Sequence, residues 1–158
     1  MAKRKKSPEE LKDDDERTNS MGLFNTAEAY RLSAMALEKA KVKSGHADDP
    51  VRFLYYHTLE LYLKALLRQK YSVEGVTKEF GHNTRRLVKE AEKLGLFVMD
   101  EDRDVFSIME DTNTVIEARY IRTGPKTWPT LEALNRTCKS MRDGVGGLLR
   151  GAGVMVRL

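Results

Sequence analysis

The sequence predicts an all-α protein, an up-and-down bundle of four to five helices, from three observations. Apolar residues recur at steps of three and four over most of the chain, which is the spacing of one helix face. No stretch alternates apolar and polar residues as a half-buried strand does. Glycine and proline gather between the periodic segments, where helices begin and end. The 158 residues are enough for one domain of ordinary size.

The first two helices are expected in the N-terminal half. One steps through Leu23, Ala27, Tyr30, Ala34 and Leu37 and ends near residues 43–45. The second covers about 50–71, with Asp48 or Asp49 as its N-cap and Pro50 at its first position. Because it is apolar over an unusually wide arc, we expect it to be the central and most buried helix.

Three more helices are expected after a loop through Gly75 and Gly81. A short helix covers about 83–94 and ends at Gly95. A fourth runs from Asp100 to Tyr120 and is followed by Gly124 and Pro125. A fifth begins at Pro129 and ends before the glycines at 144, 146 and 147.

Both ends of the chain are expected to lie outside the bundle. Residues 1–20 hold six basic and six acidic side chains, which predicts a disordered charged tail. Residues 144–158 are interrupted by glycine, which predicts a flexible glycine-rich tail. The helical domain is therefore expected over 21–143.

Composition excludes several classes of protein. No apolar run approaches the roughly 18 residues that cross a bilayer, so no membrane span is expected. The net charge of +4 is spread along the chain, so recognition of a DNA sequence by a strongly basic domain is not expected. The single cysteine, Cys138, excludes an internal disulfide framework and favours a cytoplasmic location.

No residue pattern indicates a cofactor, a metal site or a catalytic group. His46, His57 and His82 do not stand at metal-ligand spacings, and no glycine-rich loop follows a strand to hold a phosphate. Cys138 lies on the apolar face of the last predicted helix, which favours a buried structural thiol over a nucleophile.

A polar stripe crosses the predicted central helix. His57, Glu60 and Lys64 follow one another at steps of three and four, and Glu60 precedes Lys64 in the favourable order for an ion pair. Two interpretations stay open. The stripe is either the solvent face of the helix or the polar lining of an interface or pocket.

Arg119 falls on the inward face of the fourth predicted helix, where a guanidinium needs a partner. That partner is either Glu60, in a structural salt bridge, or a bound anion. Arg122 and Lys126 follow closely and make this end of the helix positive.

The short predicted helix over 83–94 carries a basic ridge. Arg85, Lys89 and Lys93 stand at successive steps of four, with Arg86 beside them. The ridge is either a solvated face or a surface that contacts phosphate.

Three segments in order resemble the HEPN family of small helical domains. They are RFLYYHTLELYLKALL at 52–67, GHNTRRL at 81–87 and EARYIRTG at 117–124. Within them stand the features typical of the family: Glu-x-x-x-Lys-Ala from Glu60, a Gly-His pair ending in His82, and an Arg-Tyr pair at Arg119 and Tyr120. The resemblance spans about 21–143.

This resemblance implies a HEPN-like bundle that dimerises and has a groove at the dimer interface. On this basis we expect Lys64, His82, Arg119 and Arg122 to contact the phosphate of a nucleotide or RNA, and His57, Glu60 and Tyr120 to be structural polar residues. His82 is expected to be structural first, because it stands at a helix start that Asn83 or Thr84 caps. The family also includes members of toxin–antitoxin, defence and nucleotidyltransferase-linked systems, so a protein partner is a second expectation.

The ribonucleases of the family share an Arg-(four to six residues)-His motif near the start of the last helix. No histidine follows His82 here, so the motif is absent from its place, and the sequence favours a member that is not an enzyme. Arg52 and His57 have the spacing, but five helical residues turn about 500° and leave their side chains about 140° apart.

Three functions therefore stay open from the sequence. The first is a binding module for a nucleotide, an RNA phosphate or a partner protein. The second is a metal-independent endoribonuclease with a non-standard site, in which His57 or His82 acts as acid or base. The third is a structural scaffold that only dimerises. A homodimer is also expected because the central helix is so apolar, with Tyr55, Tyr56 and Tyr62 suited to an interface.

Overall fold

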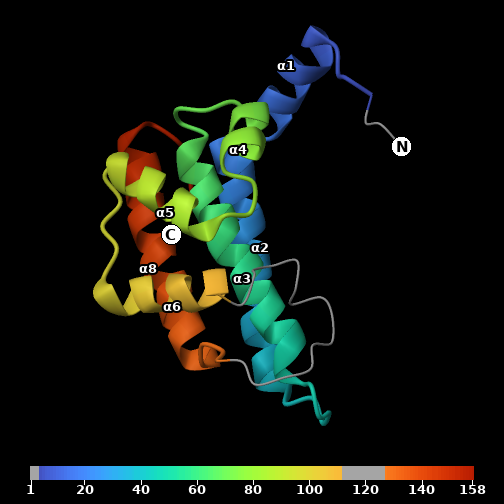
Figure 1. Cartoon of the computed structure of the whole chain (residues 1–158), viewed down its shortest axis with the longest axis vertical. Coiled ribbons are helices and arrows are strands. Elements are labelled where there is room, and N and C mark those ends of the chain that lie inside the picture. The colour runs from blue at the N-terminus through green and yellow to red at the C-terminus, as the bar shows by residue number, and fades with distance from the viewer. Residues whose placement is uncertain (1–3, 112–126) are drawn as a thin grey trace.

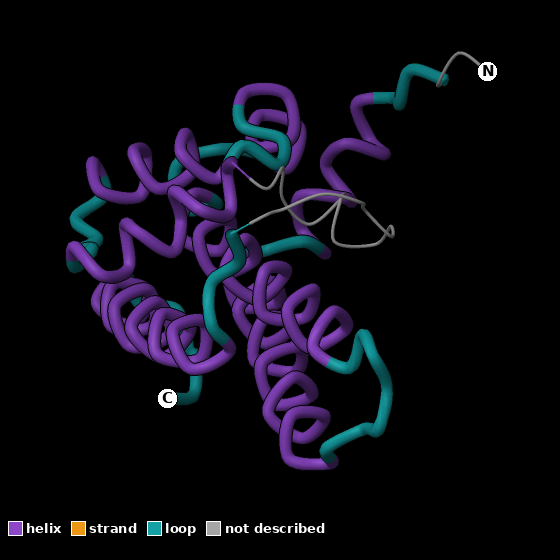
Figure 2. Tube along the Cα trace, turned by 60° about the horizontal axis from the view of Figure 1, so that its bottom comes forward, coloured by secondary structure: helices purple, strands orange, loops and turns teal. Residues whose placement is uncertain are grey.

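The computed structural model describes residues 4–111 and 127–158. Over these ranges the chain consists of helices and loops, and no strand is found in them (Figure 2). In chain order, and labelled as in Figure 1, the helices are α1 (Pro8–Arg17), α2 (Ser20–Ala40), α3 (Asp48–Leu67), α4 (Val73–Glu79), α5 (Thr84–Lys93), α6 (Asp100–Asp111) and α8 (Leu131–Gly151). The prediction of an all-α helical bundle is confirmed.

Helix α3 is the centre of the bundle. Twelve of its 20 residues are buried, and α2, α5 and α8 pack around it (Figure 1). Tyr55, Tyr56 and Tyr62 have no exposed surface. The expectation that neighbouring helices would leave these rings for a dimer interface is therefore wrong. Within one chain Tyr62 packs on Phe24 of α2, Tyr55 donates to Glu38 of α2, and Tyr56 lies against Trp128 just before α8.

The start of α3 also differs from the expectation. The helix begins at Asp48, its N-cap is Ala47, and no side chain caps it. Pro50 stands in the first turn rather than at the first position. Proline is tolerated there because the first backbone N–H groups of a helix have no partner within it.

The N-terminal segment differs from the disordered tail that was expected over 1–20, because part of it is helical. Ser7 and Glu10 form a capping box, in which the Ser7 hydroxyl accepts from the Glu10 N–H at 3.2 Å and the Glu10 carboxylate accepts from the Ser7 N–H at 2.7 Å. Helix α1 follows and extends away from the bundle without burying a residue (Figures 1 and 2). Its C-terminal end is held by Arg68, which donates to the carbonyls of Asp15 and Thr18.

The seven-residue helix α4 lies where only a loop was expected. Ser72 caps it by accepting from the Gly75 N–H at 3.0 Å. Too few apolar residues fall in so short a helix to show a period, so local capping is its main sequence signal. Gly81, at φ 54°, then turns the chain toward α5.

Helix α8 does not end before Gly144, and residues 144–158 are not a separate flexible tail. The helix continues to Gly151, with Val145, Gly146 and Leu149 buried. A Cβ on Gly144 would lie 2.9 Å from Leu96, and one on Gly146 would press on Leu158 and on the Phe24 ring. These glycines allow close approach of neighbouring segments, and burial of the helix compensates for their low helix propensity.

The last residues fold back on the bundle. The Arg150 guanidinium donates from Nε to the carbonyl of Val156 at 2.9 Å, and Val156 is itself buried. None of the helices described here has the length and apolar character to pass through a lipid bilayer.

Candidate functional site

One residue of the polar stripe on α3, Glu60, is a buried carboxylate. The Glu60 side chain is 4% exposed, and burial of an ionised carboxylate is costly unless a positive group pairs with it. The Lys64 ammonium lies 2.6 Å from Oε1 of Glu60, one helical turn away. The ion pair that the sequence predicts is present, and it lies inside the molecule rather than on a solvent face.

His82 reaches the same oxygen atom from another segment. Its Nδ1 lies 2.9 Å from Oε1 of Glu60, although the two residues are 22 positions apart in sequence. The ring stands at the entry to α5, where Asn83 is the N-cap and accepts from the Arg86 N–H at 2.9 Å. Because a carboxylate only accepts, Nδ1 donates and Nε2 is left as the second polar atom of a ring that is 47% exposed.

Loss of the His82 ring should lower stability, because it removes one of the two groups that hold Glu60. The expected decrease in the free energy of unfolding for His82→Ala is about 1–2 kcal/mol, the range for a lost buried hydrogen bond. Urea denaturation of the two proteins measures it. An unchanged midpoint together with a lost ligand-binding signal would contradict this structural role.

His57 has different surroundings from His82. Its ring packs edge-on against Tyr30, with centroids 4.5 Å apart, and parallel to Phe53 at 6.1 Å. It is half-buried between these two aromatic side chains, which supports a packing role. Arg119, Tyr120 and Arg122, the other residues that the sequence selects, lie outside the described residues.

Sequence reasoning missed a second charged cluster that joins α2, α3 and α8. The Glu28 carboxylate accepts from Arg31 at 3.0 and 3.2 Å, from Arg142 at 2.9 Å and from the Tyr62 hydroxyl. Burial opposes the charged form of Glu28, but these hydrogen bonds outweigh it and lower its pKa. Burial and the bond to Glu28 raise the pKa of Tyr62. The spacing of Glu28 and Arg31 is the only sequence signal for this cluster.

A third cluster surrounds Glu90 on α5. Its carboxylate accepts from Lys93 at 2.7 Å, from the Tyr71 hydroxyl at 2.7 Å and from Lys70 at 3.0 Å. These bonds lower the pKa of Glu90 to about 2. Lys93 is therefore part of a local ion pair, and the basic ridge is reduced to its N-terminal part.

This cluster should make stability depend on pH in the acid range. The folded protein holds Glu90 charged down to a pKa of about 2, against an ordinary 4.5, so its contribution is present above pH 4.5 and is lost as pH falls toward 2. Thermal melts at pH 2 to 6 are expected to show a smaller fall in Tm for Glu90→Gln than for the wild type. Parallel Tm curves would contradict the assignment.

The lone cysteine is in a structural position. Cys138 is fully buried in α8, and its thiol donates to the carbonyl of Tyr55 at a sulfur–oxygen distance of 3.8 Å. Burial raises the pKa of this thiol well above its ordinary value. A buried, protonated thiol is a poor nucleophile, in agreement with the expected structural role.

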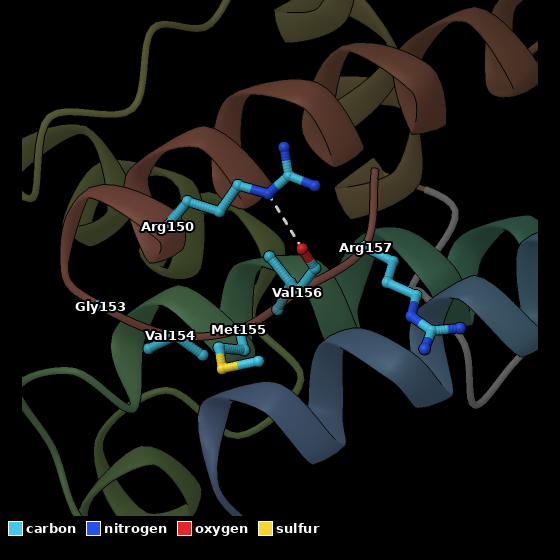
Figure 3. Close-up of a pocket in the computed structure, with 6 residues that line it drawn as sticks. All are labelled: Arg150, Gly153, Val154, Met155, Val156 and Arg157. Atoms are coloured by element: carbon cyan, nitrogen blue, oxygen red, sulfur yellow. Dashed lines mark hydrogen bonds between the residues drawn. The ribbon is translucent and has the colours of Figure 1, made fainter.

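A pocket of about 410 Å³ lies where the residues after α8 fold back on the bundle. It is lined by Arg150, Arg157 and residues 153–156. Figure 3 shows the two guanidinium groups on different sides of Val156 and directed apart. Arg150 is also engaged with the Val156 carbonyl. The two cations therefore do not converge on one anion, and this pocket is a weaker candidate than the Glu60 cluster.

The Glu60 cluster brings a cation and an imidazole to one point near the surface. The two groups come from separate elements, α3 and the α4–α5 loop, and a shared carboxylate oxygen orients both. Such an arrangement can bind an anion or move a proton. Within the described ranges, no three His, Cys, Asp or Glu side chains are grouped to hold a metal ion. Comparison of the chain with family models, curated proteins and solved structures finds no match.

Proposed function

We propose that this protein is a HEPN-like binding module that binds the phosphate of a nucleotide or RNA at Lys64 and His82. The observation that carries the proposal is the convergence of these two side chains on one buried oxygen of Glu60. Both residues belong to the segments that resemble the family, where a phosphate-binding role is implied for them. Arg119 and Arg122 are included in the proposal as further cations.

The geometry favours an anion over a neutral ligand. Lys64 uses one of its three ammonium donors on Glu60, which leaves two for another acceptor. Glu60 holds the His82 ring by Nδ1, so that Nε2 is on the half-exposed side of the cluster. With Nδ1 donating to Glu60, Nε2 donates to a phosphate only when both ring nitrogens are protonated, so His82 contacts the phosphate as an imidazolium. A pair of cations held in place before binding loses little conformational entropy when a phosphate arrives.

Fluorescence anisotropy with labelled ATP and a labelled single-stranded RNA tests this proposal. Lys64→Gln and His82→Gln are expected to weaken binding about tenfold each, the size of one lost charge-assisted hydrogen bond. Two matched controls exist. Lys78 forms the same kind of pair with Glu74 at 2.6 Å, and His46 lies 3.3 Å from Asp49, both on the surface.

Lys78→Gln and His46→Gln should leave the affinity unchanged. Equal weakening by all four variants would indicate general charge effects and contradict a site at Glu60. Absence of binding to both probes would favour a scaffold that binds only protein.

A second candidate function is a metal-independent endoribonuclease. The Glu60–His82 pair favours it, since a carboxylate that orients an imidazole through Nδ1 is the arrangement that lets Nε2 exchange a proton with substrate. RNA degradation in the presence of EDTA, lost in His82→Ala and kept in His57→Ala, would support this activity. Intact RNA after incubation with the folded wild type would contradict it.

The homodimer also remains a proposal, now without the support of the α3 tyrosines. Sedimentation velocity at micromolar concentration is expected to give twice the mass of the chain. A monomer under these conditions would contradict it, and a dimer that binds neither nucleotide nor RNA would favour the scaffold.

A further inference from the structure

A pocket of about 390 Å³ lies between α5 and α6, apart from the Glu60 cluster. It is lined by Arg85, Val88, Lys89, Glu92, Arg103, Phe106 and Ser107. The four α5 residues stand at steps of three, one and three, so they share one face of the helix. Val88 and Phe106 are buried and form an apolar floor that both helices contribute. The volume is within the range of small-molecule sites.

The positive groups around this apolar floor differ in whether an acidic side chain pairs with them. Arg85 and Lys89 stand one turn apart and are exposed, and neither side chain has an acidic partner in the part of the chain that the structure describes. Glu110 is nearby, but its carboxylate accepts from the Arg85 backbone N–H, at 3.4 Å. At the other end of the pocket Arg103 forms an ion pair with Glu92.

The lining therefore combines three cations with one carboxylate, and that carboxylate is already paired. An apolar floor with uncompensated cations at one end is complementary to a molecule that has a flat apolar part and an anionic group. A simple inorganic anion would leave the floor uncovered, and a neutral ring would leave the cations without an acceptor.

We propose that this pocket is a binding site for a small organic anion, a ring that carries a phosphate, sulfonate or carboxylate group. The ring lies on Val88 and Phe106, and the anionic group contacts Arg85 and Lys89. The site is distinct from the phosphate site proposed at Lys64 and His82 and does not depend on it.

Titration with anilinonaphthalene sulfonate, monitored by its fluorescence, tests the proposal. The matched neutral probe is N-phenylnaphthylamine, which keeps the rings and lacks the sulfonate. Arg85→Glu and Lys89→Glu are each expected to weaken sulfonate binding about tenfold or more, because each replaces a charge-assisted contact by repulsion. Ser107→Trp, which fills the pocket without a change of charge, should abolish binding.

Arg86→Glu is the control on the same helix, since Arg86 is outside the pocket and lies over the Phe80 ring. It should leave the affinity for the sulfonate probe unchanged. Thermal melts show that each variant is folded, because partly unfolded proteins also bind such dyes. Equal affinity for the two probes, equal weakening by Arg86→Glu, or full binding by folded Ser107→Trp would overturn the proposal.

Discussion

Replacement of both Lys64 and His82 by apolar residues is expected to destabilise the protein by about 3–5 kcal/mol, the cost of a buried charge left without a partner. Glu60 is buried, and Lys64 and His82 both contact its Oε1 atom, at 2.6 and 2.9 Å. In the Lys64→Met/His82→Ala variant the carboxylate keeps its desolvation cost and loses both contacts. Urea denaturation, compared with the wild type, measures the change.

Two further variants separate burial from charge. Lys78→Met breaks the pair with Glu74, which has the same sequence spacing and the same 2.6 Å distance, but whose side chains are 71% and 44% exposed. It should cost less than about 1 kcal/mol, as exposed pairs do. Addition of Glu60→Leu to the double variant should recover most of the loss, because no charge then remains buried. Equal losses for Lys78→Met and the double variant would contradict this account.

Glu28→Leu is expected to lower the free energy of unfolding by about 3 kcal/mol, the order found when one member of a buried charge cluster is removed. Arg31 and Arg142 both lie against Glu28 and are largely shielded from water, so two guanidinium groups on different helices lose their common acceptor. Tyr62 loses its hydrogen-bond partner as well. Thermal and urea unfolding of the variant measure the effect.

Tyr62→Phe is the milder change in the same cluster. It removes one neutral donor and leaves the three charged groups together, so about 1 kcal/mol is expected. The triple variant Glu28→Leu/Arg31→Leu/Arg142→Met should be more stable than Glu28→Leu alone. If the triple variant instead has a still lower free energy of unfolding than Glu28→Leu, the two arginines are stabilised by water rather than by Glu28.

Within α3 the sequence was sufficient to predict much of the candidate site. The steps from His57 to Glu60 and Lys64 place three polar side chains on one side of a helix whose other positions are apolar. The contact of Glu60 with His82 could not be predicted in the same way. It depends on the turn at Gly81, which positions a side chain 22 residues distant.

The Glu28 cluster was not predicted, for a related reason. Arg142 is 114 residues from Glu28, on a helix whose last eight residues, 144–151, were expected to belong to a tail. Two of the three glycines that suggested an end to the helix, Gly144 and Gly146, are instead positions where Leu96, Leu158 and Phe24 approach α8 closely. A glycine in the sequence can mark either the end of a helix or a point of close packing within one, and only the segments packed against it distinguish the two.

The sequence by itself determined that the fold is all-α, that α3 is the most buried of the helices the structure describes and that Cys138 lies within the core. These properties follow from local periodicity, because the side chains that face a core recur every three or four residues along one helix. Tertiary structure alone decided how fully α3 is covered, how far α8 extends and which charged groups meet. Such contacts join residues distant in sequence, and the cost of burying a charge is determined by the partner that packing brings to it.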